Sequence, residues 1–285
     1  MLSPAFTSSK MKYMLKLISD YTIDFVKFLT QLPMELRVIE TKDIFMRYTN
    51  DVIATYAFGV SVDSVQDLKN LFYIYGREAS TFNIVTLLKT VMFKQLPWIA
   101  RLVRLKFIKQ KIINFFRDFV ETTIKIRNAQ GIVRPNIMQL MIENRDEKES
   151  KLTIEDMMSQ AFIFFFDAFK SSSTLMCFAA HEIAVDKDMR KRLQNEIDQV
   201  LEDTNGQLSY EATNSMEYLD MLNETLRKYP SFLKTDRLCQ RDFELSPTLR
   251  GRKPYTVKKD DIVWLPIYAL HNDPKYFKEP EKFDL

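Results

Sequence analysis

Residues 157–184 read MMSQAFIFFFDAFKSSSTLMCFAAHEIA, which is the most unusual stretch of the chain. Its apolar residues surround a helix on nearly every side, whereas a surface helix keeps a polar face. Asp167 and Lys170 interrupt the apolar run, which therefore falls short of the roughly 18 consecutive apolar residues of a membrane span. We expect a helix buried through the middle of a large domain.

The sequence on both sides of this stretch predicts further helices, because apolar residues recur at steps of three and four. The composition turns polar over residues 127–151, where the charge run 143–149 predicts a solvated loop. After Pro230 the apolar period shortens to that of short strands. The pattern therefore predicts one mainly α domain over residues 1–285 with a small β region late in the chain. The expected helices are 8–32, 43–58, two or three within 65–105, 106–126, 187–202 and 215–228, and the expected strands are 235–245, 256–257 and 262–265.

Composition excludes several classes of protein. A formal net charge of +3 is too balanced for an electrostatic nucleic-acid binder. The five glycines are dispersed, so neither a P-loop nor a dinucleotide-binding glycine cluster is present. Two cysteines and two histidines cannot build a local zinc cluster or a disulfide scaffold, and His181-Glu182 lacks the second histidine of a metalloprotease motif because Val185 stands there. The lysines among the first twenty residues exclude a secretory signal.

Glu224 and Arg227 are three residues apart on the helix expected before Pro230, so both side chains project from one face and can pair. An isolated E-x-x-R is more often a surface ion pair, worth at most about 1 kcal/mol. The order of the surrounding segments favours a specific role. The pair lies in NETLRKYP (223–230), which precedes RLC (237–239) and YALHNDP (268–274).

This ordered set resembles the cytochrome P450 family, in particular the microsomal insect monooxygenases. Residues 2–11 resemble the end of the family's C helix, residues 47–54 its E helix, and residues 164–178 its I helix, so the resemblance covers essentially the whole chain. It implies the middle portion of the family's helical domain, from the C-helix end to just after the K helix. It also implies a haem-thiolate oxidoreductase of small lipophilic substrates that uses dioxygen and electrons from NADPH-cytochrome reductase at the endoplasmic reticulum membrane.

The resemblance assigns roles to individual residues. Glu224 and Arg227 match a structural network on the K helix, and His271 matches a structural histidine that is not the axial ligand. Arg237 matches a basic residue that contacts a haem propionate, a pairing suited to a planar guanidinium. Substrate contacts are implied at Phe164, Ala168, Ser172, Phe232, Leu233 and Thr235.

The I-helix segment departs from the family pattern of a small residue, Gly, any residue, an acid and Thr. Asp167 stands at the small residue, Ala168 at Gly, Lys170 at the acid and Ser171 at Thr. Ala168 stays small and Ser171 keeps the hydroxyl, so both can serve in the catalytic segment. A protonated lysine has no lone pair to accept a proton, so Lys170 argues against normal oxygen activation.

The resemblance covers only part of a complete family member. The family's N-terminal membrane anchor has no match here, so membrane association is expected only of a complete protein that carries the anchor. The cysteine-ligand loop has no match either, so no residue of this chain is assigned to the metal. Cys177 and Cys239 lack the surroundings of the ligand loop and are expected to be small core hydrophobes. The chain alone is therefore expected to be inactive as a fragment of an enzyme. The alternative is a non-catalytic truncated pseudoenzyme or a helical interaction protein.

Overall fold

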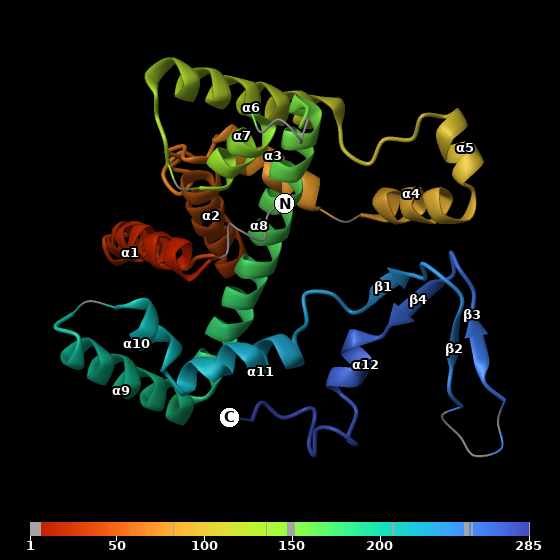
Figure 1. Ribbon diagram of the computed structural model, residues 1–285. Helices are drawn as coiled ribbons and strands as arrows, with labels where there is room; N and C mark the ends of the chain where they lie inside the picture. Colours follow the sequence, from red (N-terminus) through yellow and green to blue (C-terminus); the bar gives the residue numbers. More distant parts are fainter. Residues whose placement is uncertain are drawn as a thin grey trace. The chain divides into compact units, whose positions relative to one another are not determined.

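The computed structural model describes residues 7–81, 83–134, 136–146, 152–206, 208–247, 251 and 253–284. Helices dominate this part of the chain, and short strands follow only after residue 234 (Figure 1). The mainly α fold class with a late β region is therefore confirmed. Residues 2–6 of the predicted C-helix end (2–11) lie outside the described residues.

The chain divides into two compact units. The first unit comprises Met1–Cys177 with Gln207–Glu211, and the second comprises Phe178–Gly206 with Ala212–Leu285. The assignment of residues 1–285 to a single domain stays a prediction.

The helices that begin in the first unit are α1 (Ser8–Thr30), η2 (Met34–Leu36), α2 (Thr41–Ile53), η3 (Ala54–Phe58), α3 (Leu71–Ser80), α4 (Ile84–Gln95), α5 (Pro97–Leu102), α6 (Gln110–Gln130), α7 (Ile137–Asp146), α8 (Ile154–Val185) and α10 (Tyr210–Asn214). Helices α3, α4 and α5 are the two or three helices expected between residues 65 and 105. The second unit contains the end of α8, then α9 (Lys187–Asp203), η4 (Tyr218–Asp220), α11 (Met221–Lys228), β1 (Thr235–Leu238), β2 (Phe243–Leu245), β3 (Tyr255–Val257), β4 (Ile262–Leu265) and α12 (Ile267–His271).

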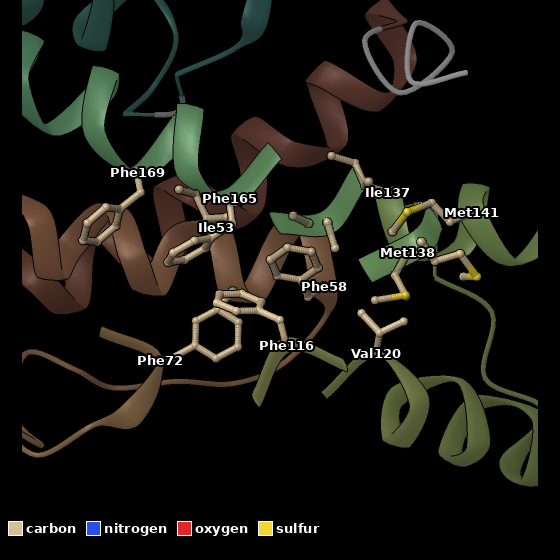
Figure 2. Close-up of a cluster of buried hydrophobic side chains, with 14 of the residues drawn as sticks. Ile53, Phe58, Phe72, Phe116, Val120, Ile137, Met138, Met141, Phe165 and Phe169 are labelled. Carbon is tan, nitrogen blue, oxygen red and sulfur yellow. The ribbon is translucent and has the colours of Figure 1, made fainter. Parts of the chain in front are cut away.

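The core of the first unit is built on one stripe of α8. Figure 2 shows the ring of Phe165 on α8 beside Phe72 of α3 and Phe116 of α6, and the ring of Phe169 one helical turn farther along α8. The ring centroid of Phe165 lies 5.3 Å from that of Phe72 and 5.5 Å from that of Phe116. These spacings are typical of packed aromatic pairs, which add about 0.5–1.5 kcal/mol each beyond the burial of their area.

The prediction that α8 is buried on nearly every side is wrong for the described chain. Its buried residues follow steps of four along one side, whereas Ile163 is 52% exposed. The other helices of the first unit pack against the side of α8 that carries Phe165 and Phe169. They leave the side that carries Ile163 exposed. Helix α8 is also long and apolar enough to cross a membrane, a test that a core helix passes as well.

Helix α7 includes residues 143–146, where the charge run predicts a loop, so that prediction is wrong for these residues. Ile137, Met138, Met141 and Ile142 are buried in the same core as α8 (Figure 2). Their spacing of one, four and five residues is that of an apolar helix face. Burial of these four apolar side chains stabilises a helix here although most of the surrounding residues are polar.

A π-helical turn, η3, extends α2 and ends at Gly59, whose φ of 71° favours glycine. Arg127 donates from Nη2 to the carbonyl of Phe58 at 2.9 Å, and Arg134 donates from Nη1 to the carbonyl of Gly59 at 3.0 Å. A Cβ atom at Gly59 would lie 2.7 Å from Nη2 of Arg127. Glycine therefore lets α6 and its following loop cap this turn.

The β region of the second unit consists of two antiparallel pairs. Strand β1 pairs with β4, and β2 pairs with β3. The single strand expected over residues 235–245 is wrong, because the described chain interrupts it between Leu238 and Phe243. Cys239 continues the first pair by donating its N–H to the carbonyl of Asp261 at 2.9 Å.

Candidate functional site

The Glu224–Arg227 pair on α11 is nearly buried, with 13% and 9% of the two side chains exposed. Arg227 donates from Nε and Nη2 to the two carboxylate oxygens of Glu224, both at 2.6 Å. The same guanidinium donates to the carbonyls of His271, Pro280 and Lys282, each at 2.9 Å. These five bonds use all five N–H donors of an arginine. The pair is therefore no surface ion pair but the joint of three chain segments.

His271 makes the reciprocal contact to α11. Its Nδ1 lies 3.1 Å from the carbonyl oxygen of Arg227. A carbonyl only accepts hydrogen bonds, so Nδ1 carries the proton in this contact. The contact agrees with the structural role expected for His271.

Several partners of this joint were not predicted. The guanidinium of Arg227 lies 4.9 Å from the ring centroid of Phe277, and the N–H of Asp284 donates to Glu224 at 3.2 Å. The prolines at 274 and 280 are typical of an extended loop, but the sequence does not reveal that this segment folds back on α11. The hydrogen bonds to Glu224 also raise the pKa of Arg227.

A second unpredicted contact ties the end of α8 to the end of α11. The rings of Phe178 and Tyr229 stack with centroids 4.2 Å apart and an interplanar angle of 4°. Glu182 accepts hydrogen bonds from the hydroxyl of Tyr229 at 2.5 Å and from Nζ of Lys228 at 3.2 Å. Glu182, which follows His181 in the incomplete metalloprotease pattern, therefore has structural partners within the second unit, Lys228 and Tyr229.

Arg237 lies on β1 with an exposed side chain. Its Nη1 donates to Oγ1 of Thr235 at 3.0 Å and to the carbonyl of Asp236 at 2.8 Å. Because side chains alternate along a strand, Arg237 shares a face with Thr235 and with the paired residues Val263 and Leu265. An exposed guanidinium beside apolar side chains suits a flat apolar molecule that carries a carboxylate.

Two of the three substrate residues predicted after α11 line one cavity. Phe232 and Thr235 border a space of about 570 Å³ together with Leu226, Pro230 and His271. Leu233 is not among its lining residues, and its carbonyl accepts from the N–H of Tyr268 at 3.0 Å. Phe232 is 61% exposed.

The predicted residues of α8 belong to the first unit. Ala168, Ser171 and Ser172 follow Phe164 at helical steps that place all four on one side of the helix. The hydroxyl of Ser171 donates to the carbonyl of Asp167 at 2.5 Å. Helix α8 is α-helical throughout, including the segment around Ala168, and alanine favours a helix by about 1 kcal/mol over glycine.

Lys170 projects elsewhere, two residues and hence about 200° around the helix from Ala168. It lines a polar cavity with Ser173 and Thr174. Burial and the charge of Lys42 lower the pKa of Lys170.

The cysteines show no sign of a metal site. Burial raises the pKa of the Cys177 thiol although Thr41 opposes this, and Sγ of Cys239 donates to the carbonyl of Arg241 at 2.9 Å. Both are only partly buried, so the expectation of core residues is wrong. Within the described ranges, no three His, Cys, Asp or Glu side chains converge to hold a metal.

Comparisons with known proteins agree on one family. The family model described as Cytochrome P450 matches residues 1–285. Cytochrome P450 9e2 of Blattella germanica is 38% identical over 99% of this chain and 58% of its own length. Probable cytochrome P450 9f2 of Drosophila melanogaster is 38% identical over 99% and 57%, and Cytochrome P450 3A31 of Mesocricetus auratus is 38% identical over 99% and 56%. The chain thus spans little more than half the length of these relatives.

Proposed function

Since the chain belongs to the cytochrome P450 family, we propose that it serves a haem-thiolate monooxygenase that oxidises a small lipophilic substrate. The match over the entire chain carries this proposal. The alternative of a non-catalytic helical protein is not favoured, because the likeness to the relatives extends over 99% of the chain. An NADPH-cytochrome reductase as electron donor and the endoplasmic reticulum membrane as location belong to the same proposal.

In this proposal the Glu224–Arg227 joint has a structural role. Arg227 fixes the segments at His271, Pro280 and Lys282 to α11. Helix α11 leads through Pro230 into β1, so the joint also sets where β1 begins. Its role is to support the strand that carries Arg237.

Arg237 would hold a propionate group of haem. The fit rests on its exposure and on its strand neighbours Thr235, Val263 and Leu265, which offer an apolar face beside the guanidinium. Bound haem would supply the redox and oxygen chemistry, which a cysteine thiolate ligand promotes. The chain's own part here is to bind and orient the group.

The remaining residues would receive the substrate. Phe232, Leu226 and Pro230 give the cavity beside β1 an apolar lining that excludes water from a lipophilic molecule. On α8, the small Ala168 leaves room beside the helix. Ser171 keeps a hydroxyl whose proton is directed to the carbonyl of Asp167, so its oxygen remains able to accept a hydrogen bond from another donor.

Haem binding by the chain tests this proposal. The chain is titrated with haem and followed by the Soret absorbance, with Arg237→Leu as the variant and Arg241→Leu, another exposed arginine, as the matched control. Loss of a charge-assisted pairing should weaken binding about tenfold in Arg237→Leu and leave Arg241→Leu unchanged. Equal affinities for all three proteins would contradict the role of Arg237.

The reaction needs a separate test. The complete protein, in which this chain is joined to a cysteine-ligand loop, is assayed with reductase and NADPH for oxygen- and NADPH-dependent oxidation of a lipophilic alkoxycoumarin. Turnover that requires the reductase supports the monooxygenase. Haem bound without any turnover would favour the non-catalytic alternative.

A further inference from the structure

A polar cavity of about 340 Å³ lies within the first unit, between the first turn of α2, the end of α3 and the middle of α8. Three cationic side chains from these three helices line it, namely Lys42, Arg77 and Lys170. The volume is at the lower end of the roughly 300–1,000 Å³ typical of small-molecule sites. The cavity therefore combines a ligand-sized space with converging positive charge.

The carboxylates in the lining do not balance these cations. Asp43 is held by a cation outside the lining, because Arg47 donates from Nε to its Oδ2 at 2.7 Å. Arg77 forms a longer ion pair with the same carboxylate, with Nη1 3.6 Å from Oδ1 of Asp43. Glu40 is the other carboxylate among the described lining residues. Among these residues and Arg47, four cationic side chains stand against two carboxylates.

The cations also repel one another. Burial, and after it the charge of Lys42, lowers the pKa of Lys170, so the charged form of Lys170 is disfavoured where it stands. An anion between the two ammonium groups would reverse that effect. Lys170 shares its side of α8 with Ser173 and Thr174, whose hydroxyls keep the lining polar.

We propose that this cavity binds a small oxyanion, phosphate as the free ion or as a lipid headgroup, between Lys42, Arg77 and Lys170. A planar guanidinium offers paired donors to phosphate oxygens, and lysine acts as a point charge. The site is separate from the side of α8 that carries Ala168. The proposal does not rest on haem binding or on monooxygenation.

Calorimetric titration of the chain with sodium phosphate at constant ionic strength tests the proposal. Saturable binding is expected, and Lys42→Met and Lys170→Met should each weaken it about tenfold, as expected for loss of one charge-assisted contact. Lys125→Met is the matched control, because Lys125 on α6 has a 78% exposed side chain outside the cavity. Lys170→Arg keeps the charge and should keep binding. Circular dichroism checks that each variant is folded.

A second measurement follows Lys170 directly. Its pKa, read from the NMR shift of the ¹³C-methylated ammonium group, should rise when phosphate saturates the chain. An unchanged pKa at saturating phosphate, or equal weakening in Lys125→Met, would overturn the proposal.

Sedimentation with phosphatidate vesicles distinguishes the two sources of phosphate. Binding to vesicles that Lys42→Met reduces, without binding of free phosphate, would identify the lipid headgroup. Binding of free phosphate alone would identify the ion. Binding of neither would overturn the proposal.

Discussion

Arg227 holds both carboxylate oxygens of Glu224 at 2.6 Å through two N–H groups of one planar guanidinium. Its three other N–H groups reach backbone carbonyls up to 55 residues away in sequence. An i, i+3 pair on a helix is usually a local contact, whereas this pair closes long loops of the second unit. Loss of Arg227 should therefore destabilise the second unit far more than loss of a local surface pair would.

Arg227→Ala should lower the free energy of unfolding by about 3–5 kcal/mol, because it leaves the Glu224 carboxylate buried and unpaired. Arg227→Lys should restore little of this loss, since an ammonium group cannot reach five acceptors in a plane. Urea denaturation followed by circular dichroism measures both values.

Glu279 and Lys282 provide the control, as another acid and cation three residues apart with Nζ 2.6 Å from Oε1. Their side chains are 54% and 62% exposed. Lys282→Met should therefore cost no more than about 1 kcal/mol. A similar loss in Arg227→Ala and Lys282→Met would contradict the structural role of the Arg227 joint.

The sequence predicted the pair and the helix that carries it, because a spacing of three residues is a local signal. It did not predict that Pro280 and Lys282 would supply acceptors, since a return of the chain over more than 50 residues leaves no periodic pattern. Likewise, the apolar content of α8 was correctly recognised, but not which side the neighbouring helices cover. Composition records how apolar a helix is, whereas burial depends on the partners that reach it.

The substrate residues illustrate the same limit. The resemblance named Phe232, Leu233 and Thr235 together, but only Phe232 and Thr235 line the cavity beside β1. The carbonyl of Leu233 instead accepts from the N–H of Tyr268, a contact with a distant segment that the resemblance does not reveal. Helix α7 was missed because its four apolar residues lie within a polar stretch.

Gly76 on α3 lets the ring of Phe165 approach the helix backbone. A Cβ atom at Gly76 would lie 2.7 Å from two ring carbons of Phe165. Gly76→Ala should therefore lower the free energy of unfolding by about 1–3 kcal/mol, although alanine favours a helix by about 1 kcal/mol over glycine. Thermal and urea unfolding measure the change.

The double variant Gly76→Ala, Phe165→Leu tests the cause of that loss. A leucine side chain can move away from the new methyl group, so the second substitution should cost less in the Gly76→Ala background than alone. Additive costs would mean that the ring of Phe165 is not what excludes a side chain at position 76.

Asp43 gives the first unit a defined dependence on pH. Burial alone would raise the pKa of Asp43, but hydrogen bonds from Tyr73 and Arg47 outweigh it and lower the pKa below its ordinary 3.8. The unfolded chain therefore binds more protons between the two pKa values. The stabilisation is present above pH 3.8 and is lost as the pH falls through the folded-state pKa.

Asp43→Asn should accordingly lower the free energy of unfolding at pH 7 by roughly 1 kcal/mol, since the carboxylate is partly exposed. The difference from the unaltered chain should shrink as the pH falls below 3.8. Urea unfolding across this range measures it, with Asp24→Asn at an exposed position of α1 as the control. A difference that is constant with pH would show that the charge of Asp43 is not its source.

Lys170 stands where the family pattern has an acid, and this bears on the proposed monooxygenase. A protonated lysine cannot accept a proton, so proton delivery should be inefficient and electrons should be lost to side reactions. In the complete protein, Lys170→Asp should then raise the amount of product formed per NADPH consumed. Lys170→Asn removes the charge without supplying an acid and should give a smaller rise. The ratio of product to NADPH, measured with reductase and the alkoxycoumarin, shows whether removal of the positive charge or supply of an acid causes the rise. Equal ratios for all three proteins would mean that Lys170 does not limit proton delivery, which would then depend on the Ser171 side of α8.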